Sequence, residues 1–561
     1  MRPHRAGACV LRKDGRVTAS SSKKGGGRRG VLAVVERLHD AVTMSDGGAP
    51  ADGDAPSASK PPGPAPRGLD AELANLPRTD LGNAERFARR YAGQFLHVAE
   101  KGWFRWDGRR WARDGAREAV ALAAHRVARL IQVEADTIAG TAADYAVEVK
   151  GDRPVMLSEK LKAWGRSSEA SGKLDAIPKH AAPMLACEAE KLDADPFKIT
   201  VLNGTLRVRP DAEDEDPIEL APHDPADLIT KLSRVEYDPL ATCPRYDAFL
   251  ADAQPAADVR RFIHQWGGLS LTGDVSQQKL VMFIGVGGAG KSTLVDAWGE
   301  IAGDYGETVP IETFLDQGRG RSAGGATPDL ALLPGVRFLR TSEPEKGAKF
   351  AEAFIKLVTG GEPIQARFNF GDFFRFKPEF KLTISGNYRP TINGNDEGIW
   401  RRMILVPWTI PVPKERKDAR LPEALRREAS GILNRLLDGL RDYLSAGPGG
   451  SAGLVLPGSI EDATTAYRED SDPLGRFLEA AIAAAPGERV RSSALYDVFA
   501  AWARASGERV WSAKGLTLAM KERGFQALRS NGMQWRDIRL TASVFDFEDI
   551  PPHPHRDDDD E

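Results

Sequence analysis

Residues 285–292 read GVGGAGKS and match the pattern G-x-x-x-x-G-K-[ST] without a mismatch. Glycines let backbone N–H groups wrap around phosphates, and the N-terminus of a following helix adds positive potential. Lys291 would reach the β- and γ-phosphates of a nucleotide and Ser292 would hold Mg²⁺, whereas Thr293 fits a helix residue better. The alternative is a glycine-rich turn with a stray lysine. The predicted nucleotide contacts are Gly285, Gly287, Gly288, Ala289, Gly290, Lys291, Ser292 and Thr293.

Three further groups could complete a site that hydrolyses a nucleotide. Glu343 and Glu345 follow a half-apolar strand pattern, and a carboxylate at such a strand end would hold Mg²⁺ and activate water. Asn387 ends a second strand pattern, where its amide could orient the attacking water. Arg401 and Arg402 precede a third, and an arginine there could reach the γ-phosphate of a neighbouring subunit. Each group has a plainer alternative: an exposed acidic loop, a turn asparagine or a surface arginine pair.

The chain of 561 residues divides into six predicted segments. Residues 1–78 are basic and rich in Pro and Gly, and such a composition buries too little apolar surface to fold. We interpret this disordered leader as a solvated tail, although its basic arm could also contact nucleic acid. The sequence LVMFI (280–284) reads as a buried strand before the glycine-rich loop, and a helical pattern follows the loop. The other segments are an α+β domain (79–240), a nucleotide-binding α/β domain (241–445), a linker (446–457), a C-terminal domain (458–545) and an acidic disordered tail (546–561).

The stretch GWFRWDGRRW alternates aromatic and polar residues and predicts a β-hairpin through Asp107-Gly108. Its aromatic and basic side chains could grip single-stranded nucleic acid by stacking and charge. We favour the alternative of a tryptophan-rich hairpin core with a solvated arginine face, because aromatic residues with a period of two mark a buried face. The residues concerned are Trp103, Arg105, Trp106, Arg109 and Arg110.

The C-terminal domain shows two helical patterns, the second of which Ser512 can cap, followed by a hairpin pattern around Asn531-Gly532. Two helices and a hairpin predict a winged helix-turn-helix. Lys514 and Lys521 on its recognition helix, with Arg529 and Arg536 on its wing, would suit duplex DNA. The alternative is a winged helix that docks a protein.

Composition excludes several classes of protein. The net charge is −3, so the chain has no global basic field and any DNA contact must come from local patches. Three widely spaced cysteines, Cys9, Cys187 and Cys243, exclude a zinc ribbon and a disulfide framework, and they fit a reducing cytoplasm. We find no apolar run of about 18 residues and therefore predict no membrane span.

Residues 355–408, from IKLVTGGEPIQARFNFGDFF to GIWRRMILVPW, resemble the superfamily 3 helicase core of the phage/plasmid primase family. That family includes satellite-phage primase-helicases and the poxvirus helicase-primase. LGNAERFARRY, TVLNGTLRVRP and ATTAYREDSDPLGRFL extend the resemblance over about residues 80–545. The resemblance implies an AAA+-like P-loop ATPase core, a helicase-associated N-terminal domain and a C-terminal winged helix. It also implies that the protein uses ATP and Mg²⁺ and forms a hexameric ring around DNA.

The resemblance assigns roles by position. Lys291 and Ser292 match the Walker A pair, and Asn387 matches the sensor 1 asparagine. The segment SEPE (342–345) matches Walker B, with Glu343 joining Ser292 as a ligand of Mg²⁺. Ser342 stands at the place of the first acidic residue, so which glutamate activates water stays open. Arg402 is the better match to the arginine finger, with Arg401 second.

Residues 364–381 match the motif that forms a pore β-hairpin in such helicases. Basic and aromatic residues alternate there and would hold a DNA strand by phosphate contact and stacking. The alternative for the phenylalanines is packing within the hairpin. These residues are Arg367, Arg375, Lys377 and Lys381, with Phe373, Phe374 and Phe376.

The resemblance predicts an ATP-dependent DNA helicase of phage or plasmid replication in the cytoplasm of a bacterial host. Family members carry a polymerising domain near the N-terminus, whereas only the predicted disordered leader precedes residue 80 here. We therefore expect no primer synthesis from this chain and a separate primase or polymerase as partner. Two alternatives are an origin-binding initiator or loader that melts DNA without processive unwinding, and a degenerate protein that binds without turnover.

Overall fold

The computed structural model describes residues 68–212, 215–318, 326–341, 343–369, 371–392, 397–447, 450–530 and 532–548. Over these ranges the chain is a mixed α/β protein with a five-stranded parallel sheet and several smaller sheets. None of the helices in these ranges is long and apolar enough to cross a membrane. The predicted tail beyond residue 548 and the turn residue Asn531 lie outside the described residues.

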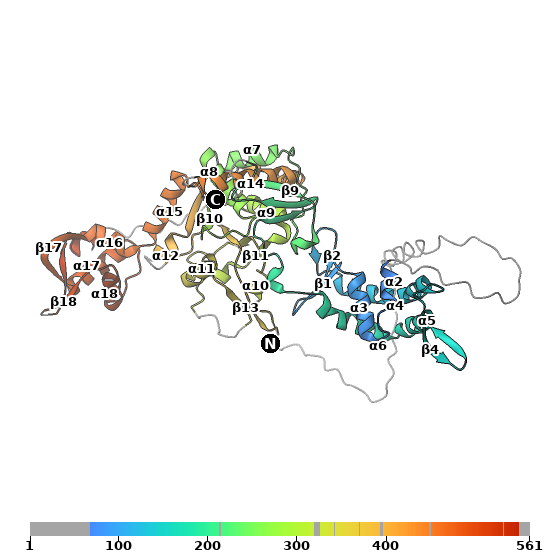
Figure 1. Ribbon diagram of the computed structural model, residues 1–561. Helices are drawn as coiled ribbons and strands as arrows, with labels where there is room; N and C mark the ends of the chain where they lie inside the picture. The colour runs from blue at the N-terminus through green and yellow to red at the C-terminus, as the bar shows by residue number, and fades with distance from the viewer. Residues whose placement is uncertain are drawn as a thin grey trace, which may run out of the picture. The chain divides into compact units, whose positions relative to one another are not determined.

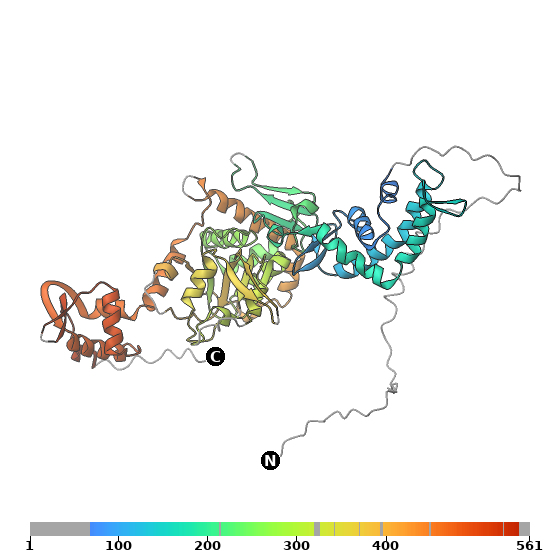
Figure 2. The same ribbon diagram turned by 60° about the horizontal axis from the view of Figure 1, so that its bottom comes forward.

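The N-terminal region consists of short sheets beside a group of helices. Helix α4 packs along α5 and α6 (Figure 2) because its buried stripe repeats at helical spacing, from Val120 through Val127 to Ile138. Its elements are α2 (Leu69–Leu73), α3 (Asp80–Arg90), β1 (Phe95–Val98), β2 (Gly102–Trp106), β3 (Trp111–Ala112), α4 (Ala116–Ile138), β4 (Ala146–Lys150), β5 (Arg153–Met156), α5 (Leu157–Ser168), α6 (Ser171–Ala181), β6 (Ala186–Cys187), β7 (Lys198–Val201), β8 (Gly204–Val208) and β9 (Ile218–Ala221).

The predicted hairpin at Asp107-Gly108 is confirmed, because β2 and β3 pair antiparallel with Trp106 opposite Trp111. Trp103 packs against the rings of Phe87 and Phe95, and Trp106 and Trp111 meet edge to face. The aromatic side chains therefore fill the interior, as the hairpin-core interpretation expects. Two of the arginines are held by other parts of the chain, and Arg109 is exposed.

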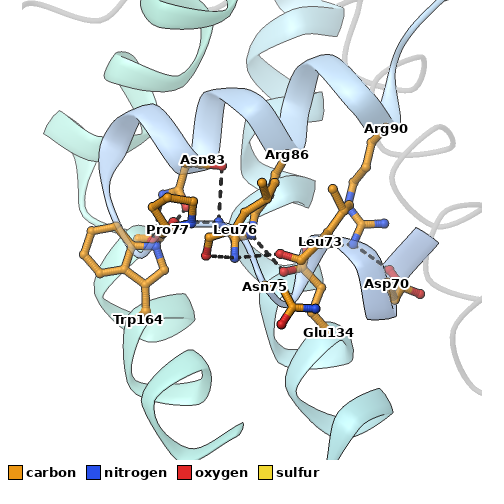
Figure 3. Close-up of polar contacts among 12 residues, drawn as sticks. Asp70, Leu73, Asn75, Leu76, Pro77, Asn83, Arg86, Arg90, Glu134 and Trp164 are labelled. Atoms are coloured by element: carbon orange, nitrogen blue, oxygen red, sulfur yellow. Dashed lines mark hydrogen bonds and ion pairs between the residues drawn. The ribbon is translucent and has the colours of Figure 1, made fainter. Parts of the chain in front are cut away.

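Ordered structure begins earlier than predicted, because helix α2 lies inside the range expected to be disordered (1–78). Figure 3 shows the reason: the fully buried Arg86 binds the segment before α3 to the helices behind it. Its Nη2 donates to Leu73 O at 3.0 Å and its Nε donates to Glu134 Oε2 at 2.8 Å. Leu73 is fully buried as well. Composition averaged over the leader could not reveal this tertiary contact.

The parallel sheet has the strand order β11-β12-β15-β10-β16, and buried side chains cover both of its faces. Helix α14 packs along α8 on one side (Figure 1). The carboxyl ends of parallel strands share one edge, where side chains that follow the strands can meet. The elements are α7 (Pro244–Ala253), α8 (Ala257–Leu269), β10 (Leu280–Gly285), α9 (Lys291–Ala302), β11 (Gly306–Val309), α10 (Pro328–Ala331), β12 (Phe338–Thr341), α11 (Glu352–Thr359), β13 (Ile364–Arg367), β14 (Phe373–Phe376), β15 (Lys381–Gly386), α12 (Glu397–Trp400), β16 (Met403–Trp408), α13 (Leu421–Arg427) and α14 (Ala429–Ser445).

The C-terminal region has helices and strands in the order α-α-β-α-α-β-β-α; its first helix packs against β16, and the other elements enclose one buried cluster. The Ser512 side chain caps α18 by accepting a hydrogen bond from Gly515 N, as predicted. Strands β18 and β19 form the predicted hairpin, and β17 joins them in the order β17-β19-β18. The elements are α15 (Gly458–Asp470), α16 (Pro473–Ala481), β17 (Ile482–Arg491), α17 (Ser492–Ala505), α18 (Ala513–Glu522), β18 (Ala527–Arg529), β19 (Met533–Leu540) and α19 (Phe545–Glu548).

Candidate active site

The glycine-rich loop connects β10 to α9 and packs tightly against two aromatic residues. Gly290 has φ of 92°, and a Cβ there would lie 2.6 Å from the Phe249 ring. A Cβ on Gly285 would lie 1.8 Å from Trp408 O. Glycine is needed at both positions because neither the conformation nor the space admits a side chain. A tight glycine loop at the N-terminus of a helix is the arrangement that binds anions through backbone N–H groups.

Lys291 is the first residue of α9 and is only 7% exposed. Its Nζ donates to Gly285 O at 2.8 Å, Val286 O at 2.7 Å and Asn387 Oδ1 at 3.0 Å. Burial lowers the pKa of this ammonium, and the nearby Glu343 carboxylate works in the opposite direction. The lysine is thus fixed at the mouth of the loop, in reach of an anion that the loop would hold.

Glu343 and Asn387 follow adjacent strands, β12 and β15, and meet at the same sheet edge. The backbone N of Asn387 donates to Glu343 Oε1 at 2.5 Å. Both residues line a cavity of about 480 Å³ together with residues 287–293. Glu345 is exposed and does not line this cavity, and Ser342 lies outside the described residues. The structure therefore separates the two glutamates, which the sequence left equivalent.

Sequence reasoning missed the part of the cavity formed by Arg340, Asp296 and Thr308. The Arg340 guanidinium donates to Thr308 Oγ1 at 2.7 Å and to Asp296 Oδ1 at 2.6 Å. It crosses α9 where Gly299 lacks a side chain, since a Cβ there would lie 2.9 Å from the guanidinium carbon. The signal in the sequence was an arginine within a short strand pattern, FLRT, that leads to the two glutamates.

The two arginines before β16 differ sharply, which corrects their predicted order. Arg402 is 6% exposed, and its guanidinium donates to Thr359 Oγ1 at 3.0 Å and to Gly398 O at 2.5 Å. It is held inside its own chain, so the exposed Arg401 is the better placed of the two to reach another subunit. Both precede the amino end of β16, whereas the glycine-rich loop follows the carboxyl end of β10. The strands run roughly 20 Å between these edges.

The predicted hairpin forms, since β13 and β14 pair antiparallel, and its place at a pore stays a prediction. Arg375 and Lys377 are exposed, and the Arg367 guanidinium lies 5.1 Å from the centre of the Phe373 ring. Lys381, by contrast, is not an exposed residue of this hairpin. It begins β15, is 3% exposed, and its Nζ donates to Thr272 O and to Glu379 O.

Burial lowers the pKa of Lys381 to about 7, with Arg337 acting in the same direction. The prediction that Lys381 binds DNA is therefore wrong, because its side chain is enclosed by protein. For the phenylalanines, packing and exposure are divided between residues. Phe374 and Phe376 pack against the core, whereas Phe373 is 47% exposed.

The four basic residues predicted in the C-terminal region are all exposed: Lys514, Lys521, Arg529 and Arg536. Helix α18 also carries Leu518, which is 59% exposed and lies at helical spacing between the two lysines. One helix face thus presents two cations around an apolar side chain.

Comparisons with known proteins found one family match and several similar proteins. Residues 84–255 match the family described as "D5 N terminal like". The chain is 27% identical over 275 residues to the putative helicase L207/L206 of Acanthamoeba polyphaga mimivirus. It is 26% identical over 271 residues to the putative helicase 022R of Frog virus 3 (isolate Goorha). Each alignment spans 46% of this chain and 28% of the viral protein.

Two solved structures of the NrS-1 C terminal region are also similar. One is 14% identical with a TM-score of 0.29 and covers 37% of this chain and 49% of its own. The other is 11% identical with a TM-score of 0.33 and covers 54% of this chain and 78% of its own.

The mixed α/β chain thus carries, over residues 84–255, a domain similar to the D5 N-terminal family. The family match and the two viral relatives confirm the expected resemblance to the phage-type helicase-primase family. Both relatives are proteins of viruses named for eukaryotic hosts, so they give no support to the expected bacterial host or to a phage or plasmid origin.

Proposed function

We propose that this chain is the ATP-hydrolysing motor of a replication helicase. The observation that carries the proposal is the meeting of Lys291, Glu343 and Asn387 around one cavity at the carboxyl edge of a parallel sheet. A cation, a carboxylate and an amide are the groups that nucleotide hydrolysis needs beside a phosphate-binding loop. The helicase names of the two viral relatives support the same function.

In this proposal the core is an AAA+-like domain of superfamily 3, and the roles are divided among the side chains of the cavity. The loop N–H groups and Lys291 bind the phosphates of ATP. Ser292 and Glu343 would hold Mg²⁺, which neutralises charge that develops on the phosphates. Glu343 also stands where it can accept a proton from the attacking water, and Asn387 orients that water. Gly290 has no side chain that could react, and its role is to shape the loop.

The proposed substrate of the motor is single-stranded DNA inside a homohexameric ring. The exposed cations Arg375 and Lys377 lie on a hairpin that projects Phe373, so phosphate contact and stacking can act together. Arg401 would complete the site of the next subunit. Primer synthesis would come from a separate primase or polymerase.

A second candidate function is an origin-binding initiator or loader that melts DNA without processive unwinding. The C-terminal region favours it, because the run from α16 to β19, in the order α-β-α-α-β-β, fits a winged helix and α18 presents Lys514 and Lys521 on one face. Duplex DNA would be the ligand of that face. The two functions differ in strand displacement, which only the helicase performs over long duplexes.

ATP hydrolysis by the full chain, with and without single-stranded DNA, tests the proposal. We expect hydrolysis that increases with DNA and is lost in Lys291→Ala. Lys414→Ala, which removes an exposed lysine outside the cavity, is the matched control and should hydrolyse ATP as the wild type does. An assembled, DNA-bound wild type without hydrolysis would contradict the motor and leave a DNA-binding protein. Strand displacement on a long forked duplex then separates helicase from initiator.

A further inference from the structure

The segment after β16, residues 409–418, lies over the glycine-rich loop, and we call it the strap. Two backbone hydrogen bonds connect the loop to this part of the chain, one to the last residue of β16 and one to the strap itself. Val286 N donates to Trp408 O at 3.0 Å, and Val412 N donates to Gly288 O at 3.1 Å. The strap therefore keeps a defined place beside residues 286–288 of the loop.

Two ion pairs fix the far end of the strap to helix α7. Arg416 pairs with Asp252, and Asp418 pairs with Arg245. These residues are the immediate neighbours of Lys417 in the chain. Exposed ion pairs contribute little stability individually, but one on each side of a residue limits where its backbone can go.

Lys417 is exposed, and its ammonium lies against the loop. Its Nζ is 3.7 Å from the position that a Cβ on Gly288 would take. Within the described ranges no carboxylate forms an ion pair with Lys417, although both neighbours in the chain have one. It is a cation held at the rim of the loop, just outside the residues that line the cavity.

We propose that Lys417 is a further nucleotide-binding residue that contacts the phosphates from the strap side of the loop. The inference rests on the proposed ATP site and adds a ligand to it. A lysine side chain is flexible, so a small rotation of its end brings the ammonium from Gly288 to a phosphate held by the same loop. Charge-assisted hydrogen bonds of this kind are roughly twice as strong as neutral ones.

The test is equilibrium binding of fluorescent mant-ADP with Mg²⁺ to the full chain, with ADP and adenosine as competitors. We expect Lys417→Ala to weaken ADP binding by about tenfold, the effect of removing one charge-assisted hydrogen bond, and to leave competition by adenosine unchanged. Lys417→Arg should retain most of the affinity. The matched control is Lys414→Ala, because Lys414 is an exposed lysine three residues earlier in the strap, in a short 3₁₀ turn (Lys414–Arg416).

Wild-type affinity for ADP in Lys417→Ala would overturn the proposal. An equal loss for ADP and adenosine would also overturn it, since the lysine would then only hold the strap. A loss confined to DNA binding would assign the ammonium to DNA phosphates and not to the nucleotide. Failure of the ATP site itself looks different: the wild type would then bind no mant-ADP, and both proposals would fall.

Discussion

Glu343 and Glu345 are equally good candidates for the general base in the sequence, but they occupy different environments in the structure. Glu343 lines the cavity and accepts a hydrogen bond from the backbone of Asn387, whereas Glu345 is exposed outside the cavity. A general base must lie within reach of the water whose proton it accepts. On position, we propose Glu343 and not Glu345 as the general base.

We predict that Glu343→Gln lowers the rate of ATP hydrolysis by about 100-fold or more, the usual contribution of a general base. Binding of mant-ADP should be retained, because the glycine-rich loop and Lys291 are unchanged. Glu345→Gln is the matched control and should hydrolyse ATP close to the wild-type rate. The reverse result, with Glu345→Gln inactive and Glu343→Gln active, would move the role two residues along the chain.

Lys381 gives a prediction about stability. Its pKa is about 7 in the folded chain against an ordinary value of 10.5, because burial disfavours the charged form. Between these values the unfolded chain binds more protons, so this lysine makes the free energy of unfolding rise with pH. The slope is at most about 1.4 kcal/mol per pH unit. Below pH 7 the cost of the buried charge is fully present.

We therefore expect Lys381→Met to remove most of the rise in unfolding free energy between pH 7.5 and pH 9.5. Urea unfolding followed by tryptophan fluorescence at several pH values measures this directly. Lys377→Met, at an exposed lysine of the same segment, should keep the wild-type pH dependence. Identical pH profiles for wild type and Lys381→Met would show that the amine is not neutral near pH 8.

At the scale of the element, the β13–β14 hairpin separates packing from exposure. Phe374 and Phe376 pack against the core and hold the hairpin in place, while Arg375, Lys377 and Phe373 remain available to a ligand. Alternation along a strand produces this division, because successive side chains point to opposite faces.

We predict that the double variant Arg375→Ala/Lys377→Ala binds single-stranded DNA more weakly and with less dependence on salt. Each cation that binds a phosphate in the wild type should, once removed, lower the slope of log K against log salt by about 0.7 for a single strand. Fluorescence anisotropy of a labelled oligonucleotide at several salt concentrations measures both quantities. Lys414→Ala is the control, and an unchanged slope in the double variant would exclude the hairpin as a phosphate-binding surface.

The sequence predicted features that depend on neighbouring residues and missed those that depend on packing. The loop between β10 and α9, the hairpin at Asp107-Gly108 and the cap at Ser512 are encoded within a few positions. The burial of Lys381 and Arg402 depends on carbonyl and hydroxyl groups contributed by distant segments. No local pattern distinguishes these cations from exposed ones.

The ordered start at residue 68 was missed for the same reason. A run rich in Pro and Gly ends there, and the buried guanidinium of Arg86 then ties Leu73 to the helices. Arg340 in the cavity likewise depends on Gly299 of another element. Long-range contacts of this kind exist only after the chain has folded.

At the scale of the whole molecule, the proposed motor would need a second copy of the chain to complete each active site. The exposed Arg401 precedes the amino end of β16, at the edge of the sheet opposite the glycine-rich loop. An arginine there cannot reach the phosphates bound to its own subunit. In the proposed closed ring with one repeated interface, the same residue would face the loop of the next subunit.

Mixing two inactive variants tests this arrangement. Arg401→Ala keeps an intact loop but lacks the arginine, and Lys291→Ala lacks the loop lysine but keeps the arginine. Each variant alone should lose activity. Arg401→Ala should hydrolyse ATP about 1,000-fold more slowly than the wild type, or slower still, because arginine fingers contribute at least that much. In mixed rings about a quarter of the interfaces pair an intact loop with an intact arginine, so roughly a quarter of the wild-type ATP hydrolysis should return. Arg402→Ala should instead lower the melting temperature, because Thr359 and Gly398 lose the partner that holds them. Mixtures that stay inactive while both variants assemble would show that Arg401 does not act between subunits.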